Sequence, residues 1–138
     1  MNNNHSSKPL ICIDFKKNRI RIHRNTLRQI GNPEYIQLLV NPDEKIIGIK
    51  ASCAEDKLAH RINEYFILTG NSYELYSREL LHMLSKVNLS WKNYDIFRLE
   101  GYISPQNQIA LFSMDNIITQ SPQTIFRKKI PGDEYAQL

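Results

Sequence analysis

Residues 10–23 read LICIDFKKNRIRIH. The first six are mainly apolar, the Lys-Lys-Asn at residues 16–18 is typical of a turn, and residues 19–23 alternate strictly between basic and apolar side chains. Alternation with a period of two is typical of a strand with one buried face and one polar face. The segment therefore predicts a β-hairpin whose second strand has one basic face.

A short helix and a second hairpin are predicted to follow this first hairpin. Residues 24–30 offer capping side chains and an apolar pair three positions apart, and a Gly-Asn-Pro sequence ends the helix. Two apolar runs at residues 35–40 and 45–50 then flank NPDE, a combination that favours a tight reversal. Residues 9–52 therefore form a first predicted unit with the order hairpin, helix, hairpin.

The same order is predicted a second time, after a connecting helix over residues 53–64. Ala54, Leu58 and Ile62 recur there at spacings of four, as on one face of a helix. The second predicted unit, residues 65–118, has a strand at 65–69, a Gly-Asn turn, an alternating strand at 72–76, a helix at 78–87 capped by Ser77, and strands at 94–102 and 108–114.

The two units align with each other at nearly constant offsets. Ile20 and Ile22 correspond to Tyr73 and Leu75 at an offset of 53, and Ile46 corresponds to Ile109 at an offset of 63. The alternative is that alternating strands and short helices match by accident.

We predict an α+β fold in which two related hairpin-helix-hairpin units form a swapped-hairpin, barrel-like core with a short connecting helix. Residues 1–8 are expected to be a flexible arm and residues 119–138 an irregular tail.

The composition limits the class of protein. The chain has 138 residues, of which 41% are hydrophobic, and this length excludes a large multidomain enzyme. No apolar run approaches the roughly 18 residues that cross a bilayer, and the first residues lack the pattern of a secretion signal. Two cysteines, Cys12 and Cys53, are therefore expected to be reduced. We expect a cytoplasmic protein with no membrane partner.

Basic residues are concentrated at the amino end. Residues 1–33 contain seven Lys and Arg against one acid, a net charge of +6, whereas the remainder has eleven against thirteen, a net charge of −2. A basic end of this kind favours phosphates or other anionic partners. The alternating strand and the following helix are expected to gather the cations into one DNA-binding surface, which consists of Lys16, Lys17, Arg19, Arg21, Arg24 and Arg28. The alternatives are a surface for an acidic protein partner and a basic face that only keeps the protein in solution.

The segment Arg19-Ile20-Arg21-Ile22, followed by Leu27-Arg28 and Ile30-Gly31 and then by an apolar hairpin, resembles the swapped-hairpin DNA-binding domain of AbrB-type transition-state regulators and MazE-type antitoxins. Two such units in one chain look like the tandem arrangement of MraZ-type regulators. His23 stands where the family usually has proline, and Ser72 stands in the second copy where the first has Arg19.

This resemblance implies a fold in which hairpins of two copies interleave, within one chain or between chains, into one small barrel. It also implies a non-enzymatic DNA-binding protein, a transcriptional regulator that forms a homodimer or a higher oligomer. The alternative is a protein-interaction or scaffold module of the same fold that does not read bases and that dimerises or binds an acidic partner.

Enzymatic chemistry is not indicated by any motif. Cys53 and His60 form an isolated C-x6-H without a second pair of metal ligands, and the sequence has no Gly-rich phosphate loop or nucleophile elbow. We therefore predict no catalytic residue, no metal and no cofactor. Trp91, between the predicted helix and the next strand, is predicted to be an interaction anchor, with packing under the loop as the equal alternative.

Overall fold

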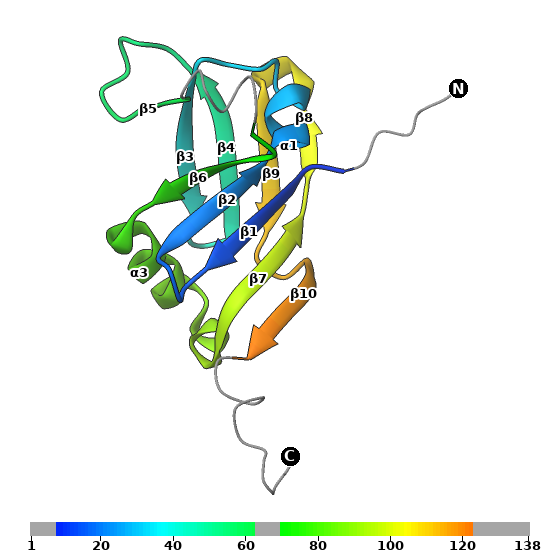
Figure 1. Cartoon of the computed structure of the whole chain (residues 1–138). Helices are drawn as coiled ribbons and strands as arrows, with labels where there is room; N and C mark the ends of the chain where they lie inside the picture. Colours follow the sequence, from blue (N-terminus) through cyan, green and yellow to red (C-terminus); the bar gives the residue numbers. More distant parts are fainter. Residues whose placement is uncertain (1–7, 63–69, 123–138) are drawn as a thin grey trace, which may run out of the picture.

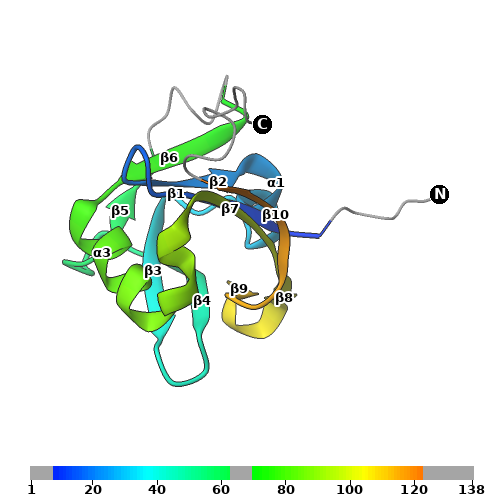
Figure 2. The same ribbon diagram turned by 90° about the horizontal axis from the view of Figure 1, so that it is seen from below.

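Two antiparallel sheets make up most of the structure. The computed structural model describes residues 8–62 and 70–122. Sheet A has the strand order β10-β7-β1-β2-β6, and sheet B has the order β5-β3-β4-β9-β8. Sheet A lies in front of sheet B in Figure 1, and the view from below in Figure 2 shows them as two layers. The predicted α+β class is confirmed, with strands outweighing helices. The described strands form two separate sheets and not a closed barrel, so the predicted barrel-like core is not found among the described residues.

The described elements have the following bounds. Sheet A consists of β1 (Leu10–Asp14), β2 (Arg19–His23), β6 (Ser72–Tyr76), β7 (Tyr94–Glu100) and β10 (Ile117–Pro122). Sheet B consists of β3 (Tyr35–Asn41), β4 (Ile46–Ser52), β5 (His60–Arg61), β8 (Tyr102–Ser104) and β9 (Ile109–Ser113). The helices are α1 (Arg24–Gln29), α3 (Arg78–Val87) and the 3-10 turns η1 (Leu89–Asn93) and η2 (Pro105–Asn107).

The predicted first hairpin is confirmed as β1 and β2. Asp14 sets its turn, because one carboxylate oxygen accepts the backbone N–H of Lys17 at 3.1 Å. Asn18 has φ 53, a left-handed conformation that asparagine tolerates better than most residues. The chain then enters α1 through His23, whose Nδ1 accepts the backbone N–H of Asn25 at 3.3 Å.

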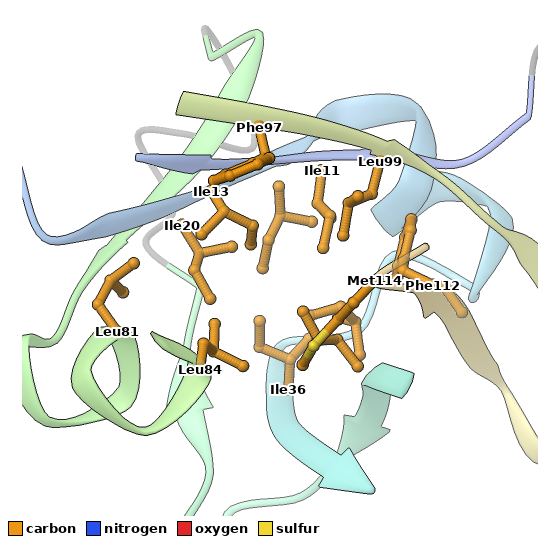
Figure 3. Packing of buried hydrophobic residues seen from close by; sticks show 14 of the residues in the cluster. Ile11, Ile13, Ile20, Ile36, Leu81, Leu84, Phe97, Leu99, Phe112 and Met114 are labelled. Carbon is orange, nitrogen blue, oxygen red and sulfur yellow. The ribbon is translucent and has the colours of Figure 1, made fainter. Parts of the chain in front are cut away.

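The core lies between the two sheets. Ile20 and Ile22 alternate with the arginines of β2 and are fully buried, as the period-two pattern predicts. Phe97 and Leu99 of β7 join them from sheet A. Leu81 and Leu84 of α3 point into the same space, as Figure 3 shows. Burial of one such isoleucine or leucine side chain stabilises the fold by roughly 1.5–3 kcal/mol.

The connecting helix predicted over residues 53–64 is wrong for its described part, residues 53–62. The chain makes two successive turns there, with Asp56 N–H bonded to the Cys53 carbonyl and Ala59 N–H bonded to the Asp56 carbonyl. Asp56 also accepts the N–H of Leu58 through its side chain at 2.9 Å, an interaction that competes with helix formation. Leu58 is 72% exposed, so the spacing of apolar residues did not reflect a buried helical face.

The strand predicted over residues 94–102 is instead divided between the two sheets. β7 belongs to sheet A and β8 to sheet B, and Gly101 joins them. A Cβ atom at Gly101 would lie 2.2 Å from the backbone oxygen of Leu111, so only glycine permits this close crossing. The division places β8 beside β9 in a hairpin closed by η2.

The two ends of the chain and one internal segment lie partly outside the described residues. The structure does not describe residues 1–7 of the predicted arm, the predicted strand at 65–69, or residues 123–138 of the predicted tail. The first part of the predicted tail is not irregular, because residues 119–122 belong to β10 and pair with β7. Within the described residues, no helix has the length and apolar character needed to cross a membrane.

Two ladders pair the first half of the chain with the second half, and each is centred on two residues separated by an offset at which the two predicted units align. Arg21 pairs with Glu74, which follows it by 53 positions, at the centre of the β2–β6 ladder. Gly48 pairs with Leu111, which follows it by 63 positions, at the centre of the β4–β9 ladder. The β3–β4 and β8–β9 hairpins also match at 63 positions, since Leu39 pairs with Gly48 and Tyr102 pairs with Leu111.

Candidate anion-binding face

The outer face of sheet A is the side of β1, β2, β6 and β7 that points away from the core. Strand alternation places polar and charged side chains on it. The registers align them in rows across the strands: one row runs Arg98, Cys12, Arg21, Glu74, and the next runs Ile96, Asp14, Arg19, Tyr76. This face therefore contains two of the predicted DNA-binding residues together with both acids that can neutralise them.

Arg19 is held inside the protein by ion pairs. Its Nε lies 3.2 Å from Oδ2 of Asp14, and its Nη1 lies 3.0 Å from Oε2 of Glu74. The side chain of Arg19 is only 13% exposed and that of Asp14 only 5%. Burial alone would lower the pKa of Arg19, but the hydrogen bond to Tyr76 and the charges of Glu74 and Asp14 raise it. Arg19 thus stabilises the sheet and is poorly placed to contact DNA.

The guanidinium of Arg21 has partners within the protein and is also partly exposed to solvent. Its Nε lies 3.5 Å from Oε2 of Glu74, and Nη2 donates to Oγ of Ser72 at 3.4 Å. Its side chain remains 41% exposed. Since the same Glu74 oxygen also faces Arg19, the carboxylate only partly compensates the charge of Arg21.

The other four predicted cations are spread along the whole length of the hairpin. Lys16 and Lys17 are exposed at the β1–β2 turn. Arg24 and Arg28 lie at the opposite end, on α1, where Arg24 bonds through Nη1 to the carbonyl oxygen of Gly70 and Arg28 is exposed. The six residues therefore do not gather at one point, although Lys16, Lys17, Arg21 and Arg28 keep surface for a ligand.

A hollow of about 240 Å³ lies on the outer face near the α1 end of β2. Two apolar residues of β1 contribute to its wall. Its polar lining consists of Cys12, Arg21, His23, Asn71, Ser72 and Arg98. Among the described residues that line the hollow, three are basic and none is a carboxylate. This arrangement suits a small anion.

The thiol of Cys12 sits in the wall of this hollow. Burial raises its pKa, and this effect outweighs the nearby charge of Arg98, which lowers it; Asp14 raises it further. Arg21 and Arg19 also lower the pKa of Cys12, but by less than Arg98. The thiol is therefore neutral at pH 7 and is not activated as a nucleophile.

Trp91 is enclosed in the core. Its side chain is 1% exposed, its ring stacks on Phe97 with centroids 4.3 Å apart, and Phe15 packs edge-on at 6.0 Å. The position predicted as an interaction anchor thus contributes packing in this structure. Aromatic pairs of this kind add about 0.5–1.5 kcal/mol beyond the burial of their area.

A second hollow, of about 370 Å³, lies on the outer face of sheet B. Its lining is mostly apolar and includes Leu39, Ile46, Ile109, Leu111 and Tyr102. Tyr102 is 59% exposed and Leu39 is 37% exposed, so large apolar side chains are accessible to a partner here.

Arg98 is a basic residue of the site that local sequence patterns did not indicate. Arg98 is exposed on β7 and, among the described residues, forms no ion pair within 4 Å. Alternation along β7 puts Arg98 on the polar face, but only the long-range β1–β7 pairing brings it beside Cys12. Alternation along residues 19–23 predicts His23 on the same face as Arg19 and Arg21, whereas its role as the N-cap of α1 depends on the backbone geometry.

The described residues contain no group of three or more His, Cys, Asp and Glu side chains arranged to hold a metal ion. Comparison of the chain with protein-family models, with curated proteins and with solved structures finds no match.

Proposed function

We propose that this protein binds DNA without enzymatic activity, in a regulatory role, through the β1–β2 hairpin and the outer face of sheet A. The observation that carries this proposal is the row in which Arg98 is exposed and, among the described residues, has no ion pair, while the side chain of Arg21 stays 41% exposed although it shares Glu74 with Arg19. Lys16 and Lys17 add two exposed positive charges at the β1–β2 turn.

The proposed contact is mainly with phosphates. β1 and β2 have β7 and β6 as neighbours on either side, so the hairpin is not a free two-stranded ribbon that can enter a major groove. Lys16, Lys17, Arg21 and Arg98 would instead contact the backbone, where counterion release dominates affinity. About four such contacts predict a slope of roughly −4 in log affinity against log salt.

We also propose that the two halves of the chain are related units that exchange hairpins within one chain. The symmetrical registers of β2–β6 and β4–β9, centred on residues 53 and 63 positions apart, support this reading. The offsets equal those at which the apolar positions of the sequence repeat. They agree with the swapped-hairpin arrangement that the resemblance to AbrB-type and MraZ-type regulators implies.

The proposed function is tested by binding of a mixed-sequence duplex at several salt concentrations. The variant Lys16→Ala plus Lys17→Ala is expected to weaken binding about tenfold and to make the salt slope shallower by about two. The matched control is Lys50→Ala plus Lys57→Ala, which removes two exposed lysines from the sheet B side of the molecule. The proposal would be contradicted if the wild-type chain did not bind the duplex, or if both variants lost the same amount of affinity.

The second candidate function is a protein-interaction module of the same fold. The apolar hollow of sheet B favours it, because an exposed tyrosine beside Leu39 and Leu111 is typical of contact surfaces. In this reading the chain forms a homodimer or a higher oligomer, or binds a protein partner. Sedimentation of Tyr102→Glu should then show dissociation, whereas Leu58→Glu, which changes an exposed residue in the β4–β5 turns, should leave the assembly intact.

A further inference from the structure

We infer that the hollow between Arg21 and Arg98 is a binding pocket for a phosphoryl group. The pocket shares Arg21 and Arg98 with the proposed DNA contact, but the inference does not require DNA as the ligand or the lysines of the β1–β2 turn. It assigns a ligand to the outer face of sheet A near the α1 end of β2, at the opposite end of that strand from the lysine turn.

The two arginines face each other across one strand. Cys12 is the Cα partner of Arg21 on β2 and of Arg98 on β7, so the two arginine backbones lie about 10 Å apart. Both residues line the hollow. Arginine side chains are long enough to converge on an anion between them, and a planar guanidinium matches two phosphate oxygens at once.

Neutral donors complete the pocket. Ser72 Oγ accepts from Arg21 Nη2, which leaves the hydroxyl hydrogen available to a ligand. His23 Nδ1 is occupied as the acceptor of the Asn25 N–H, so in its neutral form the hydrogen is on Nε2, which can donate. Asn71 also lines the hollow.

The charge balance of the pocket favours a small, highly charged anion. No carboxylate is among its described lining residues, and the Cys12 thiol is neutral. Glu74, which pairs with Arg19 and Arg21, compensates part of one guanidinium, whereas Arg98 has no ion-pair partner among the described residues. A volume of about 240 Å³ is below the usual range of drug-sized sites, so the fit is a phosphoryl group with a small substituent.

Two sources can supply such a group: free phosphate or a small phosphorylated molecule, and the phosphates of DNA. Cys12 gives a reporter that distinguishes them, because a ligand between Arg21 and Arg98 would cover its thiol. The experiment uses the full chain with Cys53→Ser, since Cys53 is the other cysteine and is exposed. The rate of Cys12 alkylation by iodoacetamide, a neutral reagent, is followed by intact mass.

The rate is measured with inorganic phosphate, with sodium chloride at the same ionic strength, and with a duplex that carries either 5′-phosphate or 5′-hydroxyl ends. Inorganic phosphate is expected to slow alkylation several-fold relative to chloride. Protection by the phosphate ion indicates a free ligand, protection by both duplexes indicates backbone phosphates, and protection by the 5′-phosphorylated duplex alone indicates a strand end. Each of these outcomes supports a phosphoryl pocket.

Arg98→Gln is expected to abolish the protection. Arg98 is exposed, so this variant should keep the melting temperature of the parent chain. The matched control is Arg78→Gln, an exposed arginine on α3 that follows the opposite end of β6. No change in rate with any of these probes, or equal protection in Arg98→Gln and in the parent chain, would overturn the inference.

Discussion

Arg21 and Glu74 lie opposite each other at the centre of the β2–β6 ladder, and their side chains form an ion pair with Nε 3.5 Å from Oε2. The same carboxylate oxygen lies 3.0 Å from Nη1 of Arg19, and the other accepts the hydroxyl of Tyr76 at 2.9 Å. One acid from the second half of the chain thus holds two arginines of the first half. It stabilises the ladder and at the same time reduces the positive charge of the face.

Glu74→Gln is expected to change stability and DNA binding in opposite directions. Loss of the charge weakens two ion pairs at a partly exposed site, so the free energy of unfolding should fall by about 1 kcal/mol. The outer face becomes more positive, so affinity for a duplex should rise and its dependence on log salt should steepen by about one. Urea unfolding and fluorescence anisotropy measure the two effects.

The control for this variant is Glu34→Gln, which removes an acid from an exposed ion pair with Arg61 beside sheet B. It changes the net charge by the same amount at a different place. If both variants raise the affinity equally, the effect comes from net charge and not from the outer face of sheet A.

Arg19→Ala is expected to destabilise the fold more than any other single arginine change on this face. It leaves the 5% exposed carboxylate of Asp14 without its guanidinium partner, and loss of one member of a buried pair costs about 3 kcal/mol. Arg28→Ala, at an exposed position on α1, should stay within about 0.5 kcal/mol of the parent. Equal unfolding midpoints for the two variants would show that the Arg19–Asp14 pair contributes little.

Elements controlled by local interactions agree with the sequence patterns. α3 runs from Arg78 to Val87 as predicted, because Ser77 accepts the N–H of Leu80 at 3.1 Å and the apolar stripe meets the core. The predicted connecting helix does not form, because the Asp56 carboxylate accepts the N–H of Leu58 and so favours turns. The apolar residues of this segment are nevertheless spaced as on one face of a helix. Gly101 divides one predicted strand for a tertiary reason, the close approach of Leu111, which no local pattern contains.

The candidate site could be predicted only in part. The outward direction of Arg19 and Arg21 follows from alternation on one strand, and it is correct. Their ion pairs depend on Glu74, which reaches them through a long-range register. The same limit applies to Arg98, which comes beside Cys12 because β7 pairs with β1. Charge counts along the sequence therefore locate the cations but do not indicate which of them are neutralised.

Asp56, in the turns between β4 and β5, should make the free energy of unfolding depend on pH in the acid range. Hydrogen bonds from Ser52 Oγ at 2.7 Å and from Leu58 N–H lower the pKa of Asp56 below its ordinary value of about 3.8. A carboxyl group whose pKa is lower in the folded state than in the unfolded state stabilises the fold when the pH is above its unfolded-state pKa. This stabilisation is lost as the pH falls through the folded-state pKa. The difference in unfolding free energy between the wild type and Asp56→Asn should be constant above about pH 5 and should shrink below about pH 4.

Ser52→Ala provides the comparison for this pH effect. It removes the largest cause of the lowered pKa, so the acid transition attributed to Asp56 should move toward the ordinary value of about 3.8. Urea unfolding of the three proteins at a series of pH values gives the result. A difference between wild type and Asp56→Asn that is independent of pH would exclude the proposed contribution.

Trp91 is the sole tryptophan, so its fluorescence reports directly on the packing of η1 against sheet A. The emission of the folded protein should be blue-shifted and poorly quenched by acrylamide, because the side chain is 1% exposed. Trp91→Ala removes the stack on Phe97 and should cost about 3–5 kcal/mol of stability. Trp91→Phe should cost less, since it keeps an aromatic ring and eliminates an indole N–H that has no hydrogen-bond partner among the described residues. A sedimentation coefficient that changes in Trp91→Phe, or ready quenching of the folded wild type, would instead indicate that this ring contacts a partner.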